Sequence, residues 1–359
     1  MKISIIAGAR PNFVKIAPII HAIQNSGNKQ LNFRLIHTGQ HYDEKMSDSF
    51  FKDLNISQPD INLGVGSGSQ AEQTAGIMVE FEKELINNPV DLVLVVGDVT
   101  STMACSIVAK KLNTKVAHIE AGIRSYDLTM PEEINRMVTD SITDYFFTTT
   151  TLASNNLKKS GIPEEKIFFV GNVMIDTLLS NINRLIKPQI YNYLNLQEKK
   201  YIVLTMHRPA NVDETEKLKQ SINQITSGVH ELPVIFPIHP RTAKIFANAG
   251  ITASNLHVTD PLGYLEFNYL VKNSMAVITD SGGITEETTV LGIPCITLRN
   301  NTERPETCTI GTNELIGTDP LKIKPALEKL FSGNWKKGKI PELWDGNSAK
   351  RIVEILSTI

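Results

Sequence analysis

Met275-Ala-Val-Ile278 runs directly into Thr279-Asp-Ser-Gly-Gly-Ile-Thr-Glu-Glu287, and this stretch decides the fold. The apolar run predicts a buried strand, and Thr288 to Leu291 predict the body of a helix. Because glycine has no Cβ, the Ser281-Gly282-Gly283 turn lets backbone come close to a ligand. The helix start adds unpaired N–H groups and the positive end of the helix dipole. Together these features predict an anion site.

Two carboxylates follow that turn at once, at Glu286 and Glu287. An acidic side chain does not favour a phosphate, so we expect at least one of them to hold something else, such as sugar hydroxyls. A phosphate and a ribose side by side indicate a nucleotide.

Strand and helix patterns alternate along the whole chain. The strand candidates are continuous apolar runs, as in parallel sheets that are covered on both faces. This order predicts two doubly wound, Rossmann-like α/β domains. The expected strands are Lys2–Ala7, Phe33–His37, Asp91–Val96, Lys115–Glu120, Tyr145–Thr149, Tyr201–Met206, Val234–Ile238, Leu256–Val258, Met275–Thr279 and Cys295–Leu298.

The length of 359 residues also favours two domains over one core. We predict an N-terminal domain over residues 1–171, joined by a C-terminal helix over residues 346–359, and a C-terminal domain over residues 172–345. In open α/β sheets, ligands bind beyond the carboxyl ends of the strands. Two such domains facing each other would place those ends on the two walls of a cleft.

Composition narrows the class of protein. The net charge is −2, which does not indicate nucleic acid or an anionic membrane surface as a partner. No apolar run reaches the roughly 18 residues that a membrane helix needs, and the N-terminus enters a strand without a signal peptide. We therefore expect a cytoplasmic protein. Of the three cysteines, Cys105 and Cys295 are expected in the core, whereas Cys308 lies in a polar segment where a reactive thiol is conceivable.

Charged residues follow the first strands. Arg10 and Lys15 come after the first strand, where they can bind a diphosphate or a carboxylate, or simply be solvated. Asp98 ends a second buried strand and either serves the site or caps the helix that begins near Thr100. Glu120 ends a third strand, and its alternative is an ion pair with Arg124.

Met130-Pro131-Glu132-Glu133 opens a helix in which Ile134, Met137, Val138 and Ile142 keep one face apolar. Acidic residues in a first turn commonly stabilise a helix, and Glu132 can form an i,i+4 pair with Arg136. However, three acids and several bases from separate segments can meet at one sheet edge. Paired acids of this kind suit proton transfer.

The second half offers weaker candidates. His207 follows a strand and could contact phosphate or move a proton, although a structural role is the alternative. His239 is similarly placed, and we expect a structural role for it. Arg304 lies beside the predicted helix-start anion site and is either a second anion contact or a surface charge. The loose dinucleotide pattern at Gly66–Ala71 follows no clear strand and predicts a loop.

These motifs together resemble one family over nearly the whole chain, the non-hydrolysing UDP-N-acetylglucosamine 2-epimerases. Each motif is weak alone, but their order and spacing are specific. The matching segments are Gly8–Lys15, Gly97-Asp98, His118–Ser125, Pro131–Arg136, His207-Arg208, Asp280–Glu287 and Thr302–Glu306.

The resemblance implies the glycosyltransferase B architecture, with UDP bound mainly by the second domain. It implies reversible epimerisation at C2 of UDP-N-acetylglucosamine, through loss of UDP to give 2-acetamidoglucal and its return. It implies no cofactor, no metal, and a homodimer. The alternatives are an epimerase for UDP-2,3-diacetamido-glucuronate and a UDP-sugar transferase of the same architecture.

The resemblance also assigns residues. Its acid–base groups match Asp98, Glu120 and Glu132, among which the C2 base stays unassigned, and His207 joins them. Its ribose-binding acid matches Glu287, while Glu286 is expected to face solvent. The remaining substrate contacts match Arg10, Lys15, Arg136, Ser281, Gly282, Gly283 and Arg304.

One segment departs from the pattern. Many bacterial members have Gln-His-Arg where this chain has Gln40-His41-Tyr42, in a segment that belongs to an allosteric substrate site. Gly39 to Met46 instead resembles relatives that act on UDP-2,3-diacetamido-glucuronate.

Overall fold

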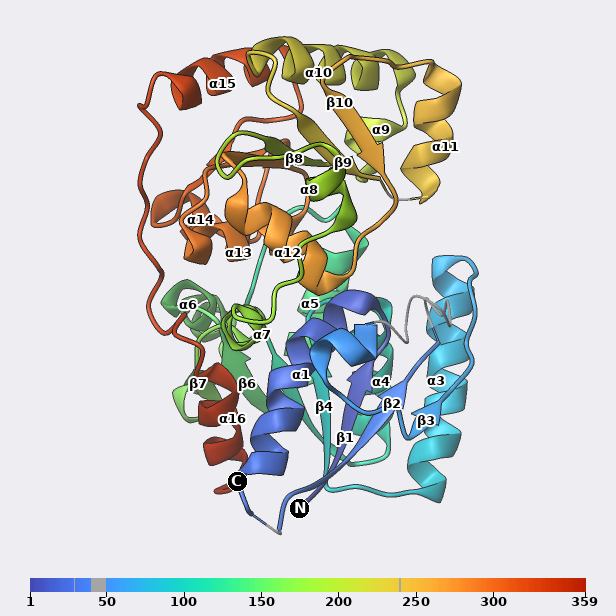
Figure 1. Cartoon of the computed structure of the whole chain (residues 1–359). Helices are drawn as coiled ribbons and strands as arrows, with labels where there is room; N and C mark the ends of the chain where they lie inside the picture. The colour runs from blue at the N-terminus through green and yellow to red at the C-terminus, as the bar shows by residue number, and fades with distance from the viewer. Residues whose placement is uncertain (29, 40–49, 239) are drawn as a thin grey trace. The chain divides into compact units, whose positions relative to one another are not determined.

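The computed structural model describes residues 1–28, 30–39, 50–238 and 240–359. The chain divides into two compact units (Figure 1), of which unit 1 comprises Met1–Ser180 with Glu342–Ile359 and unit 2 comprises Asn181–Pro341. Each is a parallel-sheet α/β unit, so the predicted pair of Rossmann-like domains is present.

Unit 1 contains a seven-stranded sheet in the order β3-β2-β1-β4-β5-β6-β7. Neighbouring strands pair in parallel throughout. All five residues of β4 are buried, which explains why its sequence is apolar without alternation. The strands are β1 (Lys2–Ala7), β2 (Asn32–His37), β3 (Ile61–Asn62), β4 (Leu92–Val96), β5 (Lys115–Ile119), β6 (Tyr145–Thr148) and β7 (Ile167–Phe169).

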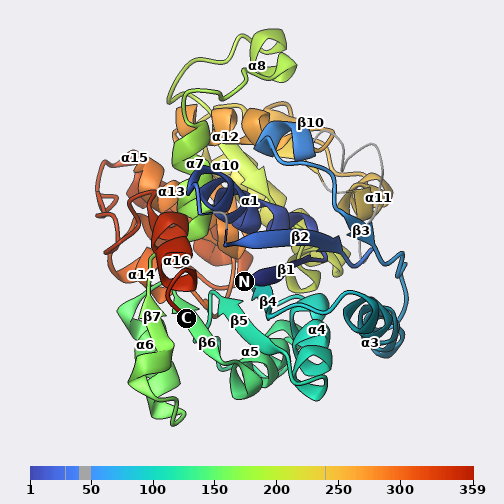
Figure 2. The ribbon, with the colours of Figure 1, turned by 90° about the horizontal axis from the view of Figure 1, so that it is seen from below.

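Helices cover both faces of this sheet. Helices α3, α4 and α5 pack side by side against one face, and α1 and α16 pack together on the other (Figure 2). The core beneath α3 and α4 includes Phe81, Val93 and Cys105, all fully buried. The helices of unit 1 are α1 (Arg10–Asn25), α3 (Gln70–Asn87), α4 (Thr100–Lys111), α5 (Pro131–Ile142), α6 (Thr151–Lys159), α7 (Val173–Asn181) and α16 (Ser348–Leu356).

Helix α5 forms where it was predicted, but its apolar face is not the buried one. Ile134 and Met137 are 48% and 47% exposed, respectively. The helix instead buries polar side chains, among them Glu133, Arg136 and Asp140. Burial of such groups requires hydrogen-bonded or charged partners. The inward face of α5 is therefore selected by polar contacts, which a hydrophobic pattern does not reveal.

Unit 2 contains a six-stranded parallel sheet in the order β10-β9-β8-β11-β12-β13. Its core lies on both faces, because Ile202 and Leu204 of β8 join one apolar cluster while Val203 joins another. The strands are β8 (Ile202–Thr205), β9 (Val234–Pro237), β10 (Leu256–Thr259), β11 (Ala276–Thr279), β12 (Cys295–Thr297) and β13 (Asn313–Leu315). The helices are α8 (Gln189–Tyr193), α9 (Pro209–Val212), α10 (Thr215–Gly228), α11 (Pro240–Ala249), α12 (Tyr264–Asn273), α13 (Gly282–Leu291), α14 (Pro305–Thr309) and α15 (Ile323–Phe331).

Helix α7 belongs to unit 1, which moves the change of unit to 180/181 from the 171/172 of the sequence-based division. Thr177 on this helix donates a hydrogen bond to the Val14 carbonyl in α1. Asp176 accepts one from the Ala349 N–H at the start of α16, at 2.6 Å. These bonds fix α7 and the returning C-terminal helix to the same core.

Trp344 also holds the returning segment in unit 1. Its side chain is 1% exposed, and its indole N–H donates to the Thr149 carbonyl at 3.1 Å. Among the described helices, none has the length and apolar character needed to cross a membrane.

We predict that Trp344→Phe lowers the free energy of unfolding by about 1–3 kcal/mol, because it removes the hydrogen bond to the Thr149 carbonyl and leaves a small void. Calorimetry and denaturant titration measure the change. Leu128→Ala, at a side chain that is 65% exposed, is the control and should stay within about 0.5 kcal/mol. Unfolding of Trp344→Phe at the wild-type midpoint would contradict the anchoring role.

Candidate functional site

The polar residues of unit 1 gather at the carboxyl ends of three neighbouring strands. Strands β1, β4 and β5 are adjacent in the sheet, and Arg10, Asp98 and Glu120 follow them in turn. Adjacent parallel strands end at one edge, so their loops meet there. The segments that carry Arg10, Asp98 and Glu120 therefore lie at the same edge within this unit.

Lys15 and Glu120 form an ion pair at this edge, with side chains 11% and 2% exposed. Gly97 makes room for the pair, because a Cβ there would lie 2.9 Å from the Lys15 Nζ atom. Glu120 has a left-handed backbone with φ of 71°, a sparsely populated conformation for a non-glycine residue. The alternative for Glu120, an ion pair with Arg124, is wrong, because Arg124 pairs with Asp140 instead.

Asn12 fixes the loop that carries Arg10. Its Oδ1 accepts hydrogen bonds from the Gly8 and Ala9 N–H groups, both at 3.0 Å. Its Nδ2 donates to the Val96 carbonyl at 3.1 Å, which ties the end of β1 to the end of β4. The Arg10 guanidinium lies over the Phe50 ring, 5.0 Å from its centroid, and burial lowers its pKa.

Arg136 joins Asp98 and Glu133 through ion pairs while only 2% of its side chain is exposed. Asp98 does not cap α4, whose N-cap residue is Val99. The expected pair between Glu132 and Arg136 is also replaced by the i,i+3 pair with Glu133. Glu132 itself lies exposed in the first turn of α5.

Glu133 ties this helix to the preceding loop. It accepts hydrogen bonds from the Ser125 N–H and the Tyr126 N–H, both at 2.9 Å. Burial raises the pKa of Glu133, but these bonds and Arg136 outweigh that effect and hold the pKa below its usual range. Glu133 was no candidate, because a first-turn acid in sequence looks like an ordinary helix stabiliser.

A second buried network lies beneath the edge and was not anticipated. His118 Nδ1 lies 2.7 Å from Asp140 Oδ1, and its Nε2 lies 2.8 Å from the Gly97 carbonyl oxygen. Arg124 also pairs with Asp140, at 2.6 Å. Burial raises the pKa of Asp140, but His118 and Arg124 outweigh it and lower the pKa overall. This network supports the loop that presents Gly97 and Asp98.

In unit 2, the Asp280 carboxylate organises the carboxyl ends of β8 and β11. It lies 2.9 Å from His207 Nδ1 and accepts a hydrogen bond from the Arg208 N–H at 2.9 Å. The Asn211 side chain donates to it at 3.1 Å. Burial raises the pKa of Asp280, but these partners outweigh it and lower the pKa overall. His207 itself is 49% exposed, so its outer ring nitrogen is accessible.

Helix α13 begins beside this carboxylate. Ser281 is its N-cap residue, and its side chain makes no capping hydrogen bond. Gly282 and Gly283 form the first helical positions, where N–H groups lack intrahelical acceptors. The strand, glycine turn and helix predicted from the sequence are therefore present, and the helix start has the character of an anion site.

One expectation and one alternative for this region are wrong. Glu286 is 1% exposed and does not face solvent, and Arg304 is 5% exposed and is not a surface charge. They form a buried ion pair with 2.9 Å between Arg304 Nε and Glu286 Oε1. The contact joins α13 to the segment after β12. It could not be predicted from a local sequence pattern, because the two residues lie far apart in the chain.

Glu287 is buried and accepts hydrogen bonds from the Tyr264 hydroxyl at 2.9 Å and the Asn268 amide at 3.3 Å. Burial raises the pKa of Glu287 to about 7, and these hydrogen bonds offset only part of that effect. Its neighbours on α12 thus hold it in one orientation beside the α13 start.

The other candidates resolve simply. Cys105 and Cys295 are buried, as expected. Cys308 lies in α14, and burial raises the pKa of its thiol, which disfavours the reactive thiolate. Gly66–Ser69 forms a loop before α3, whose N-cap is Ser69. His239, His41 and the segment 40–46 lie outside the described residues.

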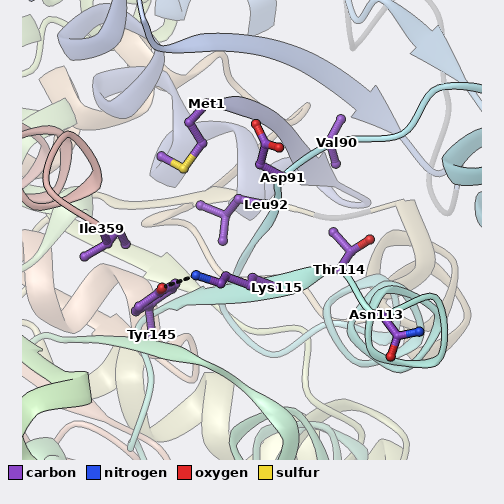
Figure 3. A pocket seen from close by; sticks show the side chains of 9 residues that line it. All are labelled: Met1, Val90, Asp91, Leu92, Asn113, Thr114, Lys115, Tyr145 and Ile359. Atoms are coloured by element: carbon purple, nitrogen blue, oxygen red, sulfur yellow. Dashed lines mark hydrogen bonds between the residues drawn. The ribbon is translucent and has the colours of Figure 1, made fainter.

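A cavity of about 480 Å3 lies at the opposite edge of the unit 1 sheet (Figure 3). Asp91, Lys115 and Tyr145 line it at the amino ends of β4, β5 and β6. The Lys115 ammonium donates to the Tyr145 hydroxyl at 2.9 Å. Ligands of open α/β sheets bind at the carboxyl ends instead.

Within the described residues, no cluster of three or more His, Cys, Asp or Glu side chains has the arrangement of a metal site.

The chain is similar to known proteins over nearly its whole length. A family model described as UDP-N-acetylglucosamine 2-epimerase matches residues 23–357. The chain is 44% identical to a UDP-N-acetylglucosamine 2-epimerase of Methanococcus maripaludis, covering 99% of this chain and 98% of that one. It is 39% identical to a UDP-2,3-diacetamido-2,3-dideoxy-D-glucuronate 2-epimerase of Pseudomonas aeruginosa, covering all of both chains at 100%.

A solved structure shares the fold. The crystal structure of the Methanocaldococcus jannaschii UDP-GlcNAc 2-epimerase, in complex with UDP-GlcNAc and UDP, superimposes with a TM-score of 0.91. The two chains are 42% identical, and 99% of each is covered.

The buried carboxyl of Glu287 predicts a pH-dependent stability. Its folded pKa of about 7 lies above the ordinary value of 4.5, so its protonated form favours the folded state. The resulting stability is fully present below about pH 4.5 and is lost as the pH rises through 7, by roughly 3 kcal/mol.

Glu287→Gln should remove this dependence, so the difference in unfolding free energy between wild type and variant should change over that interval. Denaturant titrations at several pH values measure it. Glu266→Gln, at a half-buried position on α12, is the control. Parallel pH profiles of wild type and Glu287→Gln would refute the prediction.

Proposed function

Because the chain belongs to the UDP-N-acetylglucosamine 2-epimerase family, we propose that it interconverts UDP-N-acetylglucosamine and UDP-N-acetylmannosamine by inverting C2. The observation that carries the proposal is the gathering of Asp98, Glu120, Lys15 and Arg136 at one edge of the unit 1 sheet. Acids and cations together at such an edge suit proton transfer beside an anionic leaving group.

The proposed route is elimination followed by re-addition. A carboxylate removes the C2 proton, the C2–H electron pair forms the C1–C2 double bond, and the C1–O bond breaks to release UDP. The intermediate is 2-acetamidoglucal. A proton then adds to the opposite face of C2, and UDP adds back at C1. The route is redox neutral and needs no nicotinamide.

Three carboxyls are the candidates for proton transfer. Asp98 and Glu120 are each held by a cation, Arg136 and Lys15 respectively, which fixes their orientation. Glu132 lies exposed at the start of α5, beside the Glu133 that anchors that helix. Inversion requires that a proton is removed from one face of C2 and that a proton is added to the opposite face. A pair of carboxyls, one on each face, suits this requirement. The C2 base stays open among the three.

Unit 2 supplies groups suited to the departing nucleotide. The amides at the start of α13 and the exposed ring of His207 can stabilise the charge that develops on the diphosphate. We propose Arg304 as a further contact, although its pair with Glu286 engages part of the guanidinium. Glu287 is proposed to accept hydrogen bonds from the ribose hydroxyls.

The remaining substrate contacts are proposed for Arg10 and for the guanidinium of Arg136. Burial of Arg10 against Phe50 reduces its hydration and strengthens any charge interaction that it makes. We also propose a homodimer in the cytoplasm, as expected of the family, which gel filtration with light scattering tests for the oligomeric state.

The reaction is tested by incubating the protein with UDP-N-acetylglucosamine alone in deuterated water. NMR should show deuterium at C2 of both epimers with UDP still attached. Free N-acetylmannosamine as the main product would identify a hydrolase instead. Absence of exchange unless an acceptor is added would favour a transferase.

The 39% identity to the Pseudomonas aeruginosa enzyme supports a second candidate substrate for this chain. UDP-2,3-diacetamido-glucuronate should therefore be compared directly, as the ratio of kcat/KM for the two sugar nucleotides. Exchange at C2 with the glucuronate alone would replace the primary substrate but keep the reaction type.

Asp98→Asn and Glu132→Gln should each lower kcat by about 100-fold or more while the Kd for UDP changes little. Both substitutions keep side-chain size and remove the proton-transfer group. Glu165→Gln, at an exposed position, is the control. Wild-type turnover in both variants would remove these residues from the proposed chemistry.

A further inference from the structure

Arg299 is a buried cation with an unused donor. It follows β12, and only 3% of the residue is exposed. Its Nη2 pairs with Glu303 Oε2 at 2.6 Å, but its Nη1 has no hydrogen-bond partner among the described residues. A buried donor of a charged group left without an acceptor is costly, and such groups need an explanation.

That donor lies against the start of α13. A Cβ built on Gly282, the first helical residue, would be 3.6 Å from Arg299 Nη1. Helix α13 has 10 residues, so its amino end carries a developed dipole. The guanidinium nitrogen without a partner therefore lies close to the helix start, whose N–H groups also favour an anion.

Glu303 supplies an anion at the same place. Its Oε1 would lie 2.5 Å from a Cβ on Gly282, so the carboxylate rests directly on the helix start. Burial raises the pKa of Glu303, but Arg299 outweighs it, with help from Arg208, and the pKa falls to about 2. The carboxylate is thus charged at neutral pH, beside the proposed diphosphate site.

We propose that Arg299 is a further diphosphate-binding residue, and that Glu303 is an internal anion that competes with the diphosphate for Arg299 and the start of α13. This inference rests on the proposed function in taking UDP as the ligand. A diphosphate offers more acceptor oxygens and more charge than one carboxylate, so it can satisfy the Nη1 that Glu303 leaves unpaired.

The competing interpretation is that Arg299 and Glu303 only hold their loop together. The two interpretations predict different signs. If the pair is structural, loss of either partner disturbs the loop and weakens binding of UDP. If Glu303 competes with the ligand, its neutralisation removes a like charge from the site and strengthens binding of UDP.

The test is calorimetric titration of the full chain with UDP and with uridine, which lacks phosphate. Arg299→Gln should weaken UDP binding about 10–100-fold and change uridine binding less than about two-fold. Glu303→Gln should tighten UDP binding about 3–10-fold. Lys337→Gln, which removes an exposed cation of unit 2, is the control and should leave both affinities unchanged.

Arg299→Lys keeps the charge and should recover part of the lost UDP affinity, and thermal unfolding checks that each variant is folded. Unchanged UDP affinity in Arg299→Gln, or weakened UDP binding in Glu303→Gln, would overturn the inference. If Arg299→Gln does not fold, the sign of the Glu303→Gln effect decides.

The outcome is separable from that of the proposed function. UDP affinities that change as expected, in a protein without C2 exchange, would support this inference and refute the epimerase. C2 exchange together with unchanged UDP affinity in Arg299→Gln would support the epimerase and refute this inference.

Discussion

The buried guanidinium of Arg136 is the contact on which the polar edge of unit 1 depends. It pairs with Asp98 after β4 and with Glu133 on its own helix, while Glu133 also holds the backbone of Ser125 and Tyr126. One side chain thus sets the rotation of α5 and the position of two loops. Loss of one member of a buried charge group leaves the others uncompensated, which typically costs several kcal/mol. The arrangement of this edge therefore depends on all three charged groups being present.

Asp280 has the corresponding role in unit 2. One buried carboxylate orients His207 through its ring nitrogen, fixes the backbone of Arg208, and holds Asn211. The exposed part of the imidazole is consequently presented in a fixed direction. The same arrangement occurs in both units. A buried charge at a strand end is stabilised by a neighbouring segment, and that contact fixes the orientation of the accessible groups beside it.

The sequence was sufficient where one local pattern determines the structure. Continuous apolar runs predicted parallel strands, and Ser281-Gly282-Gly283 predicted the turn into α13, as found. It failed where contacts join distant segments. Apolar periodicity in α5 placed Ile134 and Met137 on one face, but ion pairs turned the polar side inward and left both of these side chains about half exposed. Glu286 looked solvent-exposed because its partner, Arg304, comes after the next strand. No local pattern encodes such pairs.

These pairs also explain how groups so rich in charge, within each unit by itself, can suit the proposed reaction, which creates charge. Lys15 with Glu120, and Arg304 with Glu286, are held in low-exposure surroundings before any substrate binds. The folded structure holds them in one orientation, so little reorganisation would remain if, as proposed, a leaving diphosphate develops charge. In each pair the carboxylate also partly neutralises the charge of the cation, which limits how strongly that cation can attract the ligand. Several partly neutralised contacts, rather than one free cation, would suit the proposed reaction, in which UDP leaves C1 and returns to it.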